Sequence, residues 1–342
     1  VTNTAQGLLE IVSGPVTERL GEIKTLAAGI VLAALGYVAL SEAGGIVTVT
    51  ACLFLVGIGT AFQHAPSSAL IVRSYPLDGR RGPLGLYNSS GDAGKLVFSG
   101  LFSFGIGAGL AWQQISAAYG LIALAATVAI LLVARAAAEL NPRPRKAPTA
   151  DTAAPGWGIL DKRAFGALFT TVFLDTMVQT GLLVFVAFLM IEKDYPLETA
   201  TFAAVVLLVG GIFGKAGCGF LAQRMGIRSA FALIQAMTAA GLLALVLAPG
   251  WLAFLILVPL GAVAQGSTSI TYGFVADLVH PDRMARGYAL MYGSAGLSSA
   301  AGPLVFGVVA DTAGLDLTMA AMAVVSLLAV PPLYVIGTRQ TA

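Results

Sequence analysis

Eleven long apolar runs divide this chain, and each run ends at charged residues or at glycine and proline. A helix needs about 17–25 residues to cross the roughly 30 Å hydrocarbon core of a bilayer. The runs cover residues 1–18, 25–41, 46–72, 82–106, 111–135, 163–191, 197–222, 229–247, 251–278, 285–310 and 315–337. Charged residues make up only 11% of the chain, against about 25% in an ordinary soluble domain. The sequence therefore predicts an all-α membrane protein with about eleven transmembrane helices.

A charged segment between two of these runs occurs twice. It covers residues 14–26 and recurs in degenerate form at 219–231, at a spacing of 205 residues. The same spacing relates Gly14 to Gly219, Arg19 to Arg224, Gly21 to Gly226 and Arg81 to Arg286. This duplication predicts two parallel, pseudo-symmetric helical bundles. In each copy the second glycine permits a sharp turn, and the basic residues hold that turn in the aqueous layer.

A polar segment separates the two repeats. Residues 141–154 contain proline, arginine, lysine and threonine without apolar periodicity, which is typical of a solvated linker. We expect an N-terminal bundle over 1–136, a cytoplasmic linker over 137–162 and a six-helix C-terminal bundle over 163–342. The repeat spacing would place the counterpart of the helix at 163–191 before the first residue. The N-terminal bundle is therefore expected to hold helices two to six and to lack helix one.

The basic residues indicate an orientation. Lysines and arginines other than Lys95, Lys193 and Lys215 fall in loops or chain ends on one side of the membrane, and the side rich in such residues is cytoplasmic. We therefore expect a multi-pass protein of the cell, or inner, membrane with its C-terminus in the cytoplasm. The net charge of +2 is too small to indicate nucleic acid as a partner.

The segment at 14–26 reads GPVTERLGEIKTL, and it resembles the loop between helices two and three of the major facilitator superfamily. The copy at 219–231 resembles the weaker loop between helices eight and nine of that family. The candidate gating residues are Gly14, Glu18, Arg19, Gly21, Lys24, Gly219, Arg224, Gly226 and Arg286. The resemblance implies that Glu18 holds an inward gate closed by meeting Arg286 and the amino end of its helix. The run AFQHAPSSAL at 61–70 also resembles the fosmidomycin-resistance group of the same superfamily.

The resemblance implies the major facilitator fold and a secondary active transporter. In such a protein two bundles rock about a site near the middle of the bilayer, so that the site opens to one side at a time. The expected partners are a small organic solute, which can be anionic, together with protons and the lipid bilayer. We expect a monomer, and uptake and efflux both stay open. The alternative is a non-transporting sensor or assembly factor on the same fold, or a non-functional fragment.

Ionisable residues inside the runs are the candidate sites, because a charge at the bilayer centre is unfavourable by roughly 2.5–3.5 kcal/mol even on lenient scales. Glu10, Asp92, Asp175 and Lys215 each lie nine or ten residues from the cytoplasmic end of their run. At about 1.5 Å per residue they lie about 14–15 Å deep, near the middle of the membrane. We expect these residues to serve substrate binding or proton coupling.

Two pairs of opposite charges follow from these positions. Glu10 and Lys215 are equivalent in the two repeats, and the corresponding helices of the family face each other. The two are expected to form a gate or coupling site, or else a permanent salt bridge. Asp92 and Lys95 are three residues apart and share a helix face. They either neutralise one another or face the cavity, where Lys95 attracts an anion and Asp92 exchanges protons.

Asp175 has no basic neighbour in its own run, and Gln179 lies one helical turn later on the same face. An acid without a basic partner in the membrane favours its protonated form. Asp175 is therefore expected to be a proton carrier or to be hydrogen-bonded to a neighbouring helix.

Further polar residues lie where a kink is expected. Gln63 and His64 precede Pro66 inside an apolar run, and proline interrupts helical hydrogen bonding. Gln265 is the counterpart of Gln63 in the second repeat. These residues are expected either to bind solute or protons or to hydrogen-bond between helices.

The sequence lacks the motifs of the enzymes considered. It contains no Gly-x4-Gly-Lys-Ser/Thr phosphate loop and no His-Glu-x-x-His pattern, so ATP-driven transport and zinc-dependent proteolysis are not expected. Cys52 and Cys218 fall inside apolar runs and are expected to pack rather than to react. We expect no enzyme activity, no cofactor and no metal.

Overall fold

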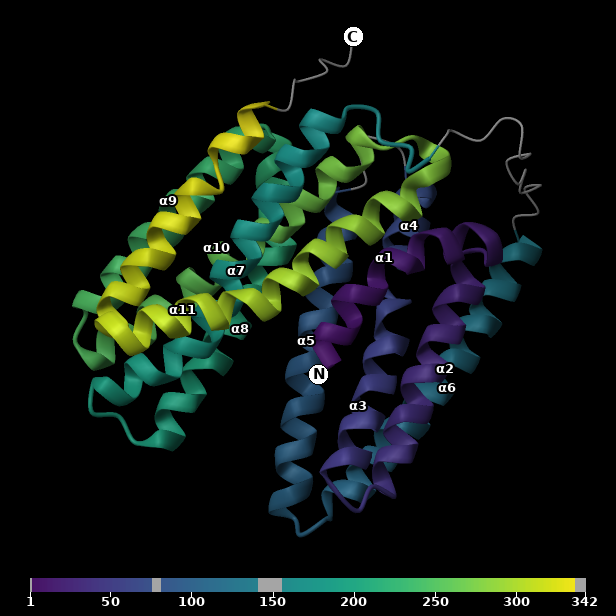
Figure 1. The fold of residues 1–342 in the computed structure, drawn as a ribbon, viewed down its shortest axis with the longest axis horizontal. Helices are drawn as coiled ribbons and strands as arrows, with labels where there is room; N and C mark the ends of the chain where they lie inside the picture. Colours follow the sequence, from purple (N-terminus) through teal and green to yellow (C-terminus); the bar gives the residue numbers. More distant parts are fainter. Residues whose placement is uncertain (1, 76–80, 141–155, 336–342) are drawn as a thin grey trace. The chain divides into compact units, whose positions relative to one another are not determined.

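The computed structural model describes residues 2–75, 81–140 and 156–335, and these residues are almost entirely helical (Figure 1). The helices are α1 (Thr2–Leu20), α2 (Glu22–Ser41), α3 (Ile46–Ala61), α4 (His64–Ser74), α5 (Arg81–Gly107), α6 (Trp112–Leu140), α7 (Lys162–Glu192), α8 (Leu197–Met225), α9 (Ile227–Leu247), α10 (Gly250–Leu278) and α11 (Met284–Leu328). The short 3-10 helices η2 (Pro281–Arg283) and η3 (Pro331–Val335) precede and follow α11. Most of the expected linker and the C-terminal residues 336–342 lie outside the described residues.

Within the described ranges, these helices account for the eleven expected spans. α3 and α4 together form one span, which is broken at Phe62 and Gln63 as expected for a kink before Pro66. α11 contains two helices, because Gly314 inside it has φ 85° and ψ 170°. Eight stretches of the described chain are long and apolar enough to cross a membrane, and α1 and α5 are outside them. These two helices carry charged residues in their interiors, which lowers their mean hydropathy.

The turns between helices repeat as the sequence does. Gly21 ends α1 with φ 86°, and Gly226 ends α8 with φ 80°. Gly109, between α5 and α6, and Gly314, inside α11, both have φ 85° and are also 205 residues apart. An L-residue with a side chain rarely adopts this conformation. The backbone therefore confirms the duplication and explains glycine at both copies of the charged segment.

The chain forms two compact units. Unit 1 contains residues 1–74, 98–160 and 279–296, and unit 2 contains residues 75–97, 161–278 and 297–342. The first part of α11 thus packs within unit 1, and most of α5 packs within unit 2. The expected division into bundles at 1–136 and 163–342 stays a prediction.

In unit 1, α2 packs against α3 and α6, while α1 packs against α3. α1 also meets the first part of α11 at small residues. A Cβ atom on Gly14 would lie 2.6 Å from the Cα of Arg286, and one on Gly296 would lie 2.5 Å from the Cα of Gly7. Backbones approach this closely only where side chains are absent. The first glycine of the charged segment is therefore needed for the contact with α11.

In unit 2, α8 and α10 cross still more closely. A Cβ atom on Gly214 would overlap the carbonyl oxygen of Ala262, and one on Gly261 would overlap that of Leu207. The Leu207 side chain is fully buried. This crossing holds α8 rigidly at the position of Lys215, the residue after Gly214.

Candidate functional site

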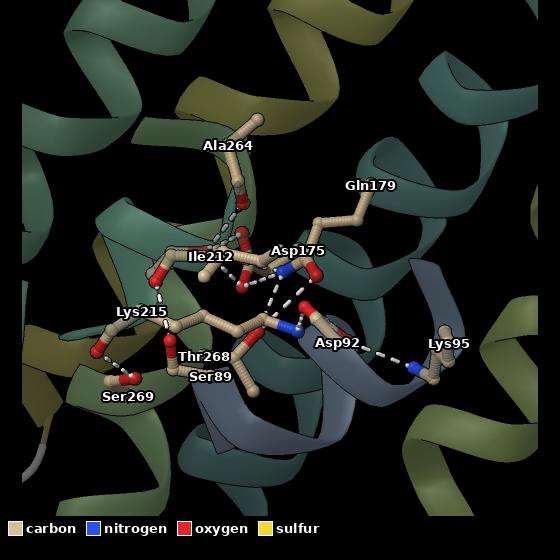
Figure 2. Close-up of polar contacts among 11 residues, drawn as sticks. Ser89, Asp92, Lys95, Asp175, Gln179, Ile212, Lys215, Ala264, Thr268 and Ser269 are labelled. Carbon is tan, nitrogen blue, oxygen red and sulfur yellow. Dashed lines mark hydrogen bonds and ion pairs between the residues drawn. The ribbon is translucent and has the colours of Figure 1, made fainter. Parts of the chain in front are cut away.

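Asp92 of α5 lies between two lysines, and the three side chains form the charged triad of this site (Figure 2). Asp92 Oδ2 is 2.5 Å from Lys215 Nζ of α8, and Asp92 Oδ1 is 3.0 Å from Lys95 Nζ. The Asp92 and Lys215 side chains are 4% and 10% exposed, whereas Lys95 is 69% exposed. The Asp92 carboxylate thus binds one buried and one solvent-exposed ammonium group.

Packing between α5 and α8 positions the triad. Ser89 Oγ, one turn before Asp92, donates a 2.6 Å hydrogen bond to the carbonyl oxygen of Ile212 on α8. A Cβ atom on Gly85 would lie 2.7 Å from the carbonyl oxygen of Lys215. That same oxygen accepts a 2.8 Å hydrogen bond from Ser269 Oγ of α10. The backbone of Lys215 is therefore fixed from two helices, while its side chain extends to Asp92.

Asp175 of α7 lies in a second cluster, which consists of neutral polar side chains. Its Oδ1 accepts a 2.6 Å hydrogen bond from Gln235 Nε2 of α9, and its Oδ2 accepts one of 2.8 Å from Gln179 Nε2. Ser267 Oγ of α10 lies 3.0 and 2.8 Å from the two carboxylate oxygens. Ser326 Oγ of α11 donates a 2.5 Å bond to Gln235 Oε1. Side chains from α7, α9 and α10 therefore meet at one buried carboxylate, and α11 joins them through Gln235.

This cluster agrees with one of the two expectations for Asp175, that of an acid hydrogen-bonded to neighbouring helices. Gln179 also donates to Thr268 Oγ1 at 3.1 Å. Thr268, like Gln235, Ser267 and Ser326, was not among the residues expected from the sequence. These are amide and hydroxyl residues inside apolar runs, and a search for such residues there would have found them.

Glu10 of α1 is fully buried in unit 1. Its Oε2 accepts a 3.4 Å hydrogen bond from Gln6 Nε2, and the carboxylate faces the backbone of Ala65 at the start of α4. Its Oε1 has no hydrogen-bond partner in the part of the chain that the structure describes. Because Glu10 lies in unit 1 and Lys215 in unit 2, the expected pair between them stays a prediction, and the observed ion partner of Lys215 is Asp92.

The break between α3 and α4 carries the remaining candidates of unit 1. The His64 ring stacks on Tyr292 of α11, with ring centroids 4.9 Å apart and planes inclined by 20°. The Tyr292 hydroxyl is 2.9 Å from Ser68 Oγ. Gln63 is half-buried at the break, and its counterpart Gln265 is buried on α10 in unit 2. His64 thus joins α4 to α11, as expected for a helix-to-helix contact.

The charged segment at 14–26 forms a cluster with the start of α11. Glu18 Oε2 accepts a 2.8 Å hydrogen bond from Arg286 Nε and a second, shorter one from Arg283 Nη1. The predicted contact between Glu18 and Arg286 is confirmed. The contribution of Arg283 was not expected, because this residue lies in η2 before the helix and outside the motif. We call this Glu18–Arg283–Arg286 cluster the latch.

Other residues of the two motif copies have different surroundings. Arg19, Lys24 and Arg224 are exposed, while Gly219 is buried within α8. Glu22 is buried and forms an ion pair with Arg73 of α4, which was not expected either. The first copy of the charged segment therefore has two acids that bind arginines in unit 1, Glu18 and Glu22.

The residues just before α7 also contact the latch. Arg286 Nη1 donates a 2.5 Å hydrogen bond to the carbonyl oxygen of Gly156, and its guanidinium lies over the Trp157 ring, 5.8 Å from the centroid. The His280 amide donates to the Gly158 carbonyl oxygen at 2.8 Å. The end of the expected linker thus holds Nη1 and one face of the Arg286 guanidinium, while Nε faces Glu18.

Within the described ranges, no three His, Cys, Asp or Glu side chains gather as metal ligands would. The membrane-length spans, the internal duplication and the charged residues buried in the helices are typical of membrane transporters. The model of the Major Facilitator Superfamily matches residues 2–228 and 168–341 of this chain. The chain therefore belongs to the Major Facilitator Superfamily.

Comparison with known proteins supports this assignment. The uncharacterized MFS-type transporter YfnC of Bacillus subtilis (strain 168) is 26% identical over 336 residues, which cover 96% of this chain and 80% of YfnC. The human organic anion transporter MFSD10 (TETRAN) matches with a TM-score of 0.77 at 16% identity, over 98% of this chain and 82% of that one. The Escherichia coli fucose:proton symporter FucP matches with a TM-score of 0.74 at 15% identity, over 96% of this chain and 88% of that one. These two structures share the fold, which confirms the all-helical major facilitator fold expected from the sequence.

Proposed function

We propose that this protein is a secondary active transporter that moves a small organic anion across the membrane by alternating access, coupled to protons. It acts as a monomer in the cell membrane, with the Gly21 and Gly226 turns and the C-terminus on the cytoplasmic side. The observation that carries the proposal is the burial of acids in the interior of membrane helices: Glu10 is 0% exposed, and Asp92 and Asp175 are each 3% exposed.

Buried acids suit proton coupling because their charge is costly within the membrane and changes with proton binding. The three acids have different partners in this protein. Asp92 has two ammonium groups, Asp175 has neutral donors, and Glu10 has the Gln6 amide. Protonation at each site would therefore break a different set of contacts, which is how a proton can favour one conformation over another.

The anionic character of the solute is supported by the two lysines of the triad, which outnumber its one carboxylate. Among proteins of this fold, MFSD10 is an organic anion transporter. FucP, a fucose:proton symporter, supports the proton coupling rather than the charge of the solute. The latch supports alternating access, because ion pairs that hold one mouth closed must break and re-form in each cycle.

The test uses the purified full chain in proteoliposomes that contain a pH-sensitive dye. A panel of organic anions and neutral solutes is added outside under an imposed pH gradient. We expect solute-dependent proton movement and solute accumulation for at least one member of the panel. Asp92→Asn, Asp175→Asn and Glu10→Gln are then compared with the parent. The variant that lacks the proton-coupling acid should lose gradient-driven accumulation of solute but keep counterflow exchange. Full pH-dependent transport in all three variants would refute proton coupling through these residues.

A further inference from the structure

We propose that the charged triad of Asp92, Lys95 and Lys215 is the binding site for the carboxylate group of a monoanionic solute, and that Asp92 takes up one proton as this carboxylate binds. The inference rests on the proposed function and deepens it, since it names the class of solute, the groups that bind it and the number of protons. It follows from the charges of the triad, from their geometry and from their different exposure.

The triad has an excess positive charge. One carboxylate and two ammonium groups give a net charge of +1, and each carboxylate oxygen already has one ammonium partner at 2.5 or 3.0 Å. α5 runs over 27 residues, so it is about 40 Å long, and Asp92 and Lys95 lie near its middle. An excess positive charge at this depth attracts an anion. A carboxylate has two oxygens, one for each of the two lysines.

The fixed backbone lets a solute replace Asp92 without movement of α8. If Asp92 takes a proton, its carboxylate becomes a neutral acid and its ion pair with Lys215 is lost. The ammonium group of Lys215 then needs another anion, while its backbone stays held by Ser269 and by the close contact at Gly85. Once the neutral Asp92 side chain rotates away, a solute carboxylate can take its place between the lysines, with one oxygen toward each.

Charge is conserved in this exchange. The empty triad carries +1, from one aspartate anion and two lysine cations. The loaded triad also carries +1, from a neutral aspartic acid, two lysine cations and one solute anion. Because the two forms have the same charge, the electrostatic penalty of holding the triad in the membrane is similar with and without solute. The proton and the monoanion therefore bind together, in a ratio of one to one.

Exposure indicates the order in which the lysines meet the solute. The Lys95 side chain is 69% exposed and the Lys215 side chain 10%. A charged side chain at mid-membrane depth lies in water-filled space rather than in lipid, so Lys95 is the first cation that an entering carboxylate meets. Lys215, shielded from water, then forms the stronger contact.

The charged groups around Asp92 come from three helices. Lys95 belongs to α5, Lys215 to α8, and Asp175 of α7 interacts electrostatically with Lys215. Asp175 is held by Gln179, Gln235 and Ser267, so it does not depend on Lys215 for its hydrogen bonds. A negative charge on Asp175 would oppose a second anionic group on the solute, which favours monocarboxylates over dicarboxylates.

The test measures binding and proton uptake on the purified full chain. The probes are benzoate and lactate, with benzamide and lactamide as neutral matches and succinate as a dianion. Binding is followed by the thermal unfolding midpoint, and proton uptake by a dye in weakly buffered solution. We expect a monocarboxylate to raise the midpoint, its amide to leave it unchanged, and about one proton to be taken up for each anion bound.

Two variants form a matched pair. Asp92→Asn frees Lys215 permanently, so it should bind the carboxylate without proton uptake and with little dependence on pH. Asp92→Asn combined with Lys215→Met leaves no buried charge unpaired but removes the cation, so it should fold and lose affinity roughly tenfold or more. Lys193→Gln, which removes a lysine that holds the carbonyl groups of Val246 and Ala248 outside the triad, should bind as the parent does.

The outcomes separate this site from the proposed function. Equal effects of carboxylates and amides, no binding by any carboxylate of the panel, or undiminished proton uptake in Asp92→Asn would each overturn the site. Proton-driven transport of a neutral solute in proteoliposomes would also overturn it while leaving the proposed function intact. Carboxylate binding with one proton in a protein that moves no solute would support the site and refute the transport function.

Discussion

Replacing Glu18 by glutamine should open the mouth of the protein beside the Gly21 turn. Glu18 of α1 accepts hydrogen bonds from Arg286 Nε at 2.8 Å and from Arg283. Its carboxylate faces the start of α11, where unpaired N–H groups favour a negative charge. Glutamine has the same shape, so the close packing at Gly14 remains. The substitution removes only the negative charge that both guanidinium groups contact.

The magnitude follows from the burial of the three side chains. Glu18 is 12% exposed, Arg283 17% and Arg286 22%, so water screens the contacts only in part. Charged hydrogen bonds contribute about 1.5–3 kcal/mol when buried, and exposed ion pairs contribute about 0.2–1 kcal/mol. We take about 2 kcal/mol for the two contacts together. A shift of this size changes the ratio of closed to open states about thirtyfold.

The assay is the labelling rate of a cysteine placed at Thr17, which is 1% exposed on α1 and shares the helix face of Gly14. Cys52 and Cys218 are first replaced by alanine, so that the reporter is the sole thiol. Labelling by a water-soluble maleimide should rise in Glu18→Gln and in Arg286→Ala. Gln223→Ala, at the equivalent position of the second copy, is exposed and should leave the rate unchanged. Equal labelling in all variants and the parent would remove the latch from the mechanism.

Three further predictions concern the turn, the Asp175 cluster and the segment before α7. Gly21→Ala forces a side chain into a φ of 86° and should lower the free energy of unfolding by about 1–2 kcal/mol, as should Gly226→Ala. The control is Gly44→Ala, because no atom lies within 4 Å of the added Cβ. An unchanged unfolding midpoint in both turn variants would contradict the reasoning. Gln235→Leu removes a donor to Asp175 and the acceptor of Ser326. It should lower the free energy of unfolding by about 1–3 kcal/mol, measured by thermal unfolding. An unfolding midpoint equal to that of the parent would mean that these hydrogen bonds do not contribute to stability. Trp157→Ala removes the ring beneath Arg286. Losing a cation–π interaction of about 0.5–1 kcal/mol should raise the labelling rate of the Thr17 cysteine about threefold, whereas Trp157→Phe keeps most of the contact. A labelling rate equal to that of the parent in the alanine variant would exclude this segment from the latch.

The sequence alone was sufficient for the features that depend on local pattern. The apolar runs predict helices of membrane length because the bilayer requires each backbone polar group to be satisfied within its own helix. The glycines at 21 and 226 predict turns because their conformation is rarely open to other residues. The contact of Glu18 with Arg286 was also expected, through the resemblance of residues 14–26 to the loop of the major facilitator superfamily.

Only the tertiary structure decided which polar groups meet. Lys215 binds Asp92 because glycine at position 85 lets α5 reach α8, and no periodicity in either helix records that approach. Asp175 is satisfied by side chains from α7, α9 and α10, which are 4, 60 and 92 residues away along the chain. Arg283 joins the latch from a short helix outside the motif. A buried charge is stabilised by whichever partner the packing brings within about 3 Å, and that choice depends on how distant helices cross rather than on the residues beside it in sequence.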